Sequence, residues 1–148
     1  MTEIGFYQLL ATPLETALPK LLEKALARGL RASVAAGSAE RAQALDAALW
    51  TYAPESFLPH GRAPAQAAEQ PIWLSADIEN PNNAVLLVTL GGHIPARFED
   101  WERVCDMFDG TDETALEAAR GRWKTLKAAG HALSYWRQTT AGGWEKAA

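Results

Sequence analysis

Short apolar runs alternate with longer segments of helical periodicity, and this alternation limits the fold more than any other feature of the chain. The run at 4–10 is apolar enough to be a strand buried on both faces, as in a parallel sheet. The runs at 31–36, 71–75 and 84–90 are predicted as further strands. Strands that alternate with helices predict a three-layer α/β domain with a mostly parallel sheet. The length of 148 residues suits one core, so we expect 1–148 to form a single domain.

Four helices are predicted from the apolar spacing outside these runs. Pro13 suits a helix start and Gly29 a helix end, whereas Pro19 is an awkward interior residue that indicates either a kink or the real start of this helix. A last strand is expected at 131–138, followed by a flexible tail at 142–148. The predicted helices cover 13–29, the residues from Ser38 to Leu49, 95–109 with Phe98, Trp101, Val104, Cys105 and Phe108 inward, and 111–129.

Composition excludes several classes of function. The net charge of −4 and the pI near 5.4 argue against a broad surface that follows phosphates, because duplex binding needs concentrated Lys and Arg. One cysteine, Cys105, lies among apolar residues and suits a buried thiol in a reducing compartment. We find no secretory signal pattern and no apolar stretch of about 20 residues, so a cytoplasmic protein is expected.

Catalytic and cofactor motifs are absent from the sequence. The first strand-to-helix connection, residues 10–13, has no glycine to let a backbone approach a phosphate. His60, His93 and His131 share no metal-ligand spacing, so neither a metal site nor catalytic residues are expected. The alternative is a nucleotide- or cofactor-dependent α/β enzyme that uses the turn at Gly91-Gly92.

The helix predicted at 111–129 has a basic flank beside an aromatic residue. Arg120, Lys124 and Lys127 are spaced i, i+4 and i+7, so they share one side of the helix, and Trp123 borders them. Two interpretations remain: a solvated helix face with one core tryptophan, or a small cleft that binds an acidic peptide. A third function, direct binding of single-stranded DNA by these cations and tryptophans, is the least favoured because the total charge is acidic.

A second notable segment runs from Leu45 to Gly61. Trp50 is predicted at the apolar end of a helix, where the chain enters a turn, and a rigid Phe-Leu-Pro-His sequence follows at 57–60. A tryptophan at such a place is either part of the core or an anchor for a partner protein, because it brings a large contact area at a small entropic cost. The spacing does not decide between the two.

Taken together, these residues resemble the chi subunit family of the bacterial DNA polymerase III holoenzyme over nearly the whole chain. The most specific parts are the Leu-Trp to Pro-His stretch and the terminal Gly-Gly-Trp-Glu-Lys. The matching positions are 6–7, 45–50, 56–60, 70–72, 102–104, 108–110, 119–120, 123–124, 130–131, 135–136 and 142–146.

The resemblance implies a Rossmann-like domain with no nucleotide site and no activity of its own, within a DNA-directed DNA polymerase complex. It implies a bridge between the clamp-loader complex, through a psi subunit where the host has one, and single-stranded DNA-binding protein, whose acidic, phenylalanine-ending tail is bound. A repair helicase is a further implied partner, and DNA is reached only indirectly. Leu116 replaces a basic residue of some members, so tail affinity is expected to be weaker unless Lys127 compensates. The implied tail site consists of Trp50, Arg120, Trp123, Lys124 and Lys127.

Overall fold

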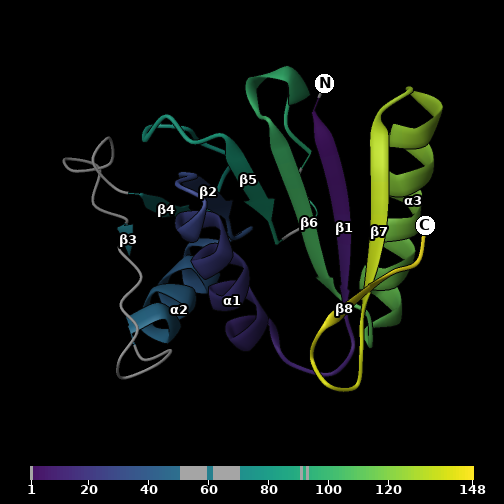
Figure 1. Cartoon of the computed structure of the whole chain (residues 1–148), viewed down its shortest axis with the longest axis horizontal. Helices are drawn as coiled ribbons and strands as arrows, with labels where there is room; N and C mark the ends of the chain where they lie inside the picture. Colours follow the sequence, from purple (N-terminus) through teal and green to yellow (C-terminus); the bar gives the residue numbers. More distant parts are fainter. Residues whose placement is uncertain (1, 51–59, 62–70, 91, 93) are drawn as a thin grey trace.

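The structure, a computed structural model of the whole chain, describes residues 2–50, 60–61, 71–90, 92 and 94–148. These residues form one sheet in the order β3-β4-β2-β5-β6-β1-β7-β8, in which every pair is parallel except β7 and β8 (Figure 1). The strands are β1 (Glu3–Leu9), β2 (Ala32–Ala35), β3 (His60–Gly61), β4 (Ile72–Ser75), β5 (Leu86–Thr89), β6 (Arg103–Asp109), β7 (Ala132–Gln138) and β8 (Trp144–Lys146). The helices are α1 (Leu14–Ala27), α2 (Ala39–Trp50) and α3 (Glu113–Ala128), with a 3-10 turn η2 at Phe98–Asp100.

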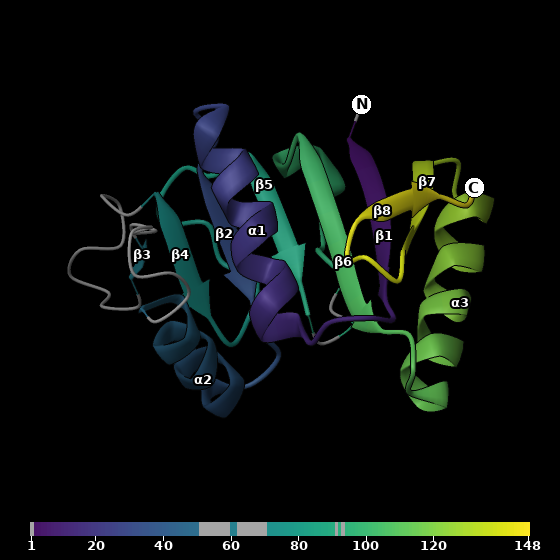
Figure 2. The same cartoon turned by 60° about the horizontal axis from the view of Figure 1, so that its bottom comes forward.

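The helices lie on both faces of the sheet. On one face α2 packs on β4 while α1 packs on α2 and β6, and on the other face α3 packs on β6 and β7 (Figures 1 and 2). Each face has its own apolar cluster: Leu18, Leu22 and Leu45 belong to the α1–α2 cluster, whereas Ala119 and Leu126 belong to the α3 cluster. The predicted three-layer α/β fold is therefore confirmed.

The helix predicted at 95–109 is wrong. Only η2 is helical there, and β6 follows it between β5 and β1. The spacing of Trp101, Val104, Cys105 and Phe108 imitates a helix because β6 is buried on both faces, so apolar residues follow one another without alternation. In the strand, Val104 and Phe108 face α3, while Cys105 faces α1.

Two further sequence predictions concern Pro19 in α1 and the segment at 142–148. α1 is continuous through Pro19, which is buried inside it, and Gly29 follows its end with φ +74°, a conformation that suits glycine. The segment expected to be a flexible tail contains β8, which pairs antiparallel with β7. Trp144 of β8 meets Tyr7 edge to face at a centroid distance of 5.2 Å, so the hairpin packs onto the α1 face of the sheet.

Candidate functional site: a basic flank on α3

The helix α3 begins at a defined cap. The Asp112 carboxylate accepts hydrogen bonds from the backbone N–H groups of Thr114 (2.9 Å) and Ala115 (3.3 Å), which have no partner within the helix. Gly130, with φ +87°, follows the helix and allows the chain to turn into β7. The predicted helix at 111–129 is therefore confirmed, and its start lies two residues later than expected.

The inward face of α3 holds an aromatic cluster. Trp123 is half-buried and meets Phe6 at 5.5 Å and Tyr135 at 5.7 Å between ring centroids, both edge to face. The Tyr135 hydroxyl donates a 2.7 Å hydrogen bond to the Gln8 side-chain oxygen, which fixes that ring. Trp123 thus packs against the core without being fully buried.

The three cations of the flank lie at the surface of α3. Arg120, Lys124 and Lys127 are all exposed, and none of them forms an ion pair or hydrogen bond with another described residue. Arg120 lies on the side of β7: burial raises the pKa of Tyr135, and the charges of Arg137 and Arg120 oppose that shift. We call Arg120, Trp123, Lys124 and Lys127 the α3 flank. It lines neither of the two cavities described below.

Arg122, on the opposite side of the helix, is neutralised. Its guanidinium forms two hydrogen bonds with the Asp106 carboxylate, at 2.7 and 2.9 Å, and both side chains are nearly buried. Gly92 lies against the same guanidinium, since a Cβ there would come within 2.9 Å of an Arg122 nitrogen. Arg122 therefore holds the helix on β6 and adds nothing to the exposed charge.

Trp50 is carried by a different helix from the α3 flank. It ends α2, which packs on β4 through the apolar cluster of the opposite face, so the sheet separates its backbone from α3 (Figure 2). The backbone of Trp50 and those of the four other residues predicted for the tail site therefore lie on two faces of the sheet. The segment at 51–59, which includes Phe57 and Pro59, lies outside the described residues.

Comparison with known proteins decides the family. The model of the family described as "DNA polymerase III chi subunit, HolC" matches residues 1–134, which include all of α3. The chain belongs to this family. The match ends within β7, so Trp136, Gln138 and β8 lie beyond it.

Two relatives carry names of the same chi family. A protein of Rickettsia prowazekii (strain Madrid E), named "Probable DNA polymerase III subunit chi", is 33% identical over 75 residues, 50% of this chain and 46% of that protein. The chain thus matches about half the length of that relative. "DNA polymerase III subunit chi" of Pseudomonas aeruginosa is 27% identical over 137 residues, which are 90% of this chain and 94% of the relative.

The place where α/β folds often hold a phosphate is filled by a side chain in this chi family member. At the end of β1, the Gln138 side-chain oxygen accepts hydrogen bonds from three successive backbone N–H groups, those of Leu10 (3.0 Å), Ala11 (2.8 Å) and Thr12 (3.1 Å). The Gln138 amide nitrogen donates to the Thr12 hydroxyl at 2.7 Å. Donors that would otherwise point at an anion are therefore already used.

Sequence reasoning missed the role of Gln138. More than 120 residues separate it from its partners, and no local pattern indicates such a contact.

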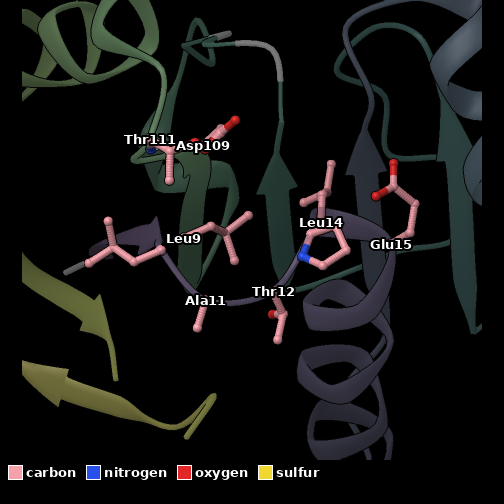
Figure 3. A pocket seen from close by; sticks show the side chains of 9 residues that line it. Leu9, Ala11, Thr12, Leu14, Glu15, Asp109 and Thr111 are labelled. Carbon is pink, nitrogen blue, oxygen red and sulfur yellow. Dashed lines mark hydrogen bonds between the residues drawn. The ribbon is translucent and has the colours of Figure 1, made fainter. Parts of the chain in front are cut away.

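A cavity of about 350 Å³ lies beside this connection, where β1 and β6 end and α1 begins (Figure 3). The charged side chains that line it, Glu15 and Asp109, are both acidic. The Thr111 hydroxyl and backbone N–H donate hydrogen bonds to Asp109, and these lower the pKa of its carboxyl group. Two carboxylates disfavour a nucleotide phosphate in this cavity.

The remaining sequence predictions about chemistry concern Cys105, the Gly91-Gly92 turn and metal binding. Cys105 is 1% exposed, and burial raises the pKa of its thiol to about 11, so the prediction of a buried structural thiol is confirmed. Of the Gly91-Gly92 turn, only Gly92 is described, and it packs against Arg122. Within the described residues no group of three metal-ligating side chains gathers, and no helix is long and apolar enough to cross a membrane.

Proposed function

We propose that this chi family chain is a non-catalytic adaptor that links the clamp-loader complex to single-stranded DNA-binding protein during DNA replication. In this proposal the α3 flank binds the acidic, phenylalanine-ending tail of that protein. One observation supports it above the others: three exposed cations without partners among the described residues lie beside a half-buried indole on a chain whose net charge is −4.

The chemistry of each group suits such a tail. A carboxylate accepts two parallel hydrogen bonds from a guanidinium, which makes Arg120 the best candidate for the terminal carboxyl group. Lys124 and Lys127 would attract the acidic side chains that precede it. The partly exposed Trp123, held by Phe6 and Tyr135, would offer a rigid apolar surface to the terminal phenylalanine ring.

The test replaces Arg120 with alanine and measures tail-peptide binding by calorimetry at low salt. We expect the affinity to fall by about 1–3 kcal/mol, as for a lost charge-assisted hydrogen bond. Binding by the unaltered chain should also weaken as salt is added, because exposed charges are screened.

Arg97→Ala is the matched control. Arg97 is also exposed, and it lies in η2's flanking loop where it pairs with Glu99 and Asp100 rather than with a ligand. This variant should bind the tail as the unaltered chain does. Equal affinity of the Arg120 variant and the unaltered chain would remove Arg120 from the site.

A bridge needs a second surface, and the position of Trp50 favours one on the opposite face of the sheet. We expect Trp50→Ala to reduce capture of the clamp-loader complex while tail affinity stays within about twofold. We expect Arg120→Ala to have the reverse effect. If both variants lose both partners, the two surfaces are not separate.

A further inference from the structure

A second cavity, of about 880 Å³, opens on the α1 face of the sheet. Residues of β5, β6 and β1 form its floor, and residues of α1 and the β7–β8 hairpin form its two walls. Figures 1 and 2 show these three strands between α1 and β8. We call it the α1 groove. It lies on the opposite face from the α3 flank, so it is independent of the proposed tail site.

One wall of the α1 groove carries a row of cations. Lys20, Lys24 and Arg28 are exposed, follow one another every four residues along α1, and have no ion pair with another described residue. Successive members are separated by about 6 Å along the helix axis. Glu23 is the carboxylate on this wall. A row with a regular repeat suits a ligand whose negative charges also repeat.

The floor of the groove adds a partly buried guanidinium. Arg103 is half-buried; its guanidinium donates a long hydrogen bond of 3.4 Å to the Tyr7 hydroxyl and also interacts with Cys105 and with the charge of Glu3. Burial raises the pKa of Tyr7 to about 12, so that hydroxyl stays neutral and does not balance the charge of Arg103. A guanidinium has five N–H donors, so these contacts leave donors that an anion in the groove can use.

The opposite wall is aromatic and rigid. Trp136 stacks on Tyr7 with the two rings 11° from parallel, and Trp144 meets Tyr7 at 89°. Both indoles are half-buried and line the groove. Flat apolar rings fixed opposite a row of cations are the arrangement with which proteins bind single strands, because bases stack while the charges follow the backbone.

We propose that the α1 groove binds single-stranded DNA, with Lys20, Lys24 and Arg28 along the phosphates and the indoles of Trp136 and Trp144 under the bases. A duplex is disfavoured because its stacked bases offer no free face to these rings and the chain as a whole is acidic. An acidic peptide would satisfy the cations but has no flat group at each repeat to use the aromatic wall.

The test measures the binding of a fluorescent oligothymidine of about a dozen nucleotides by anisotropy, with tryptophan quenching as a second signal. We compare Lys20→Ala/Lys24→Ala with the matched control Lys124→Ala/Lys127→Ala, which removes the same charge from the opposite face. The groove variant should lose about tenfold or more in affinity, and its logarithmic salt slope should decrease by about 0.7 for each lost phosphate contact. The control should retain affinity and slope.

The aromatic contribution is tested with Trp144→Leu, in which the hairpin keeps an apolar residue. This variant should show weaker binding and less quenching, with an unchanged salt slope, because stacking rather than charge is lost. Its thermal unfolding and that of the groove variant are measured alongside, so that a misfolded protein is recognised. Arg103→Gln provides a second test of the anion contact on the floor.

Several results would overturn the proposal. Failure of the unaltered chain to bind the oligonucleotide at low salt would do so, as would an equal loss of oligonucleotide affinity in the groove and α3 variants. Thymidine monophosphate competing as well per molecule as the oligonucleotide would also contradict the proposal. So would an acidic peptide that displaces the oligonucleotide from the groove. Failure of the tail-binding proposal is distinguishable, since Lys124→Ala/Lys127→Ala would then leave tail affinity unchanged whatever the oligonucleotide does.

Discussion

The three hydrogen bonds accepted by Gln138 give the sharpest prediction about the fold. We consider Gln138→Met, which keeps the length and volume of the side chain but removes both the acceptor and the donor. Gln138 is 4% exposed, and its oxygen is the partner that the structure provides for the N–H groups of Leu10, Ala11 and Thr12. The connection between β1 and α1 would therefore lose its internal support.

The expected loss of unfolding free energy depends on how many of the three N–H groups are left without a hydrogen-bond partner. A buried N–H group without a partner costs about 1–3 kcal/mol, but Leu10 and Ala11 are exposed residues whose N–H groups water can partly reach. Counting one or two donors as unsatisfied, we expect Gln138→Met to lower the free energy of unfolding by about 2–4 kcal/mol. A domain of this size has about 5–15 kcal/mol in total, so the variant should still fold.

Two companion variants separate the contributions of the Gln138 oxygen and nitrogen. Gln138→Glu keeps an acceptor for the three N–H groups, so its stability at neutral pH should stay within about 1 kcal/mol of the unaltered chain. Thr12→Val removes only the bond from the Gln138 nitrogen, at a cost of about 1 kcal/mol.

Urea unfolding gives the free energies, and hydrogen exchange reports the three amides directly. If Gln138→Met loses less than about 0.5 kcal/mol and its three amides stay protected, the reasoning fails.

Two further predictions concern buried titratable groups on β6. Burial raises the pKa of Asp106 in the folded chain, and the hydrogen bonds and charge of Arg122 offset this rise only in part. The stabilisation that Asp106 gives is therefore fully present below the ordinary carboxyl pKa of about 3.9. It is lost as the pH rises through the folded-state pKa. The unfolding free energy of the unaltered chain, measured relative to Asp106→Asn, should thus fall as pH rises in this range; a rise would mean that pairing with Arg122 outweighs burial. Burial likewise raises the pKa of the Cys105 thiol to about 11, so a thiol reagent near neutral pH should react only as fast as the chain unfolds, and rapid labelling of the folded chain would contradict the described burial.

The sequence predicts most elements well where one periodicity dominates. α3 is amphipathic, so the spacing of Arg120, Lys124 and Lys127 correctly assigns them to one exposed flank. The 95–109 region fails for the opposite reason, because β6 is buried on both faces and its apolar residues show no period of two. The period of apolar residues reflects which faces of an element are buried. It distinguishes a strand from a helix only when one face is exposed to solvent.

The candidate site shows a second limit. The spacing that groups Arg120 with Lys124 is local, whereas the association of Trp50 with them depends on which face of the sheet α2 covers. The sequence also does not reveal that Arg122 is paired, since its partner Asp106 lies on a strand that was expected to be a helix. Whether a charged side chain is free to bind a ligand depends on partners that lie far away in the sequence. Local spacing does not reveal those partners.

The two cationic surfaces lie on opposite faces of one sheet, and this separation gives the last prediction. The α3 flank and the α1 groove share no residue, and the sheet with its two apolar clusters lies between them. A tail peptide and a single strand should therefore bind together: saturating tail peptide should change oligonucleotide affinity by less than about twofold, since net charge is screened at physiological salt over about 8 Å. Competition in proportion to occupancy would show that both ligands use one surface, and the groove and α3 double variants would then identify which one.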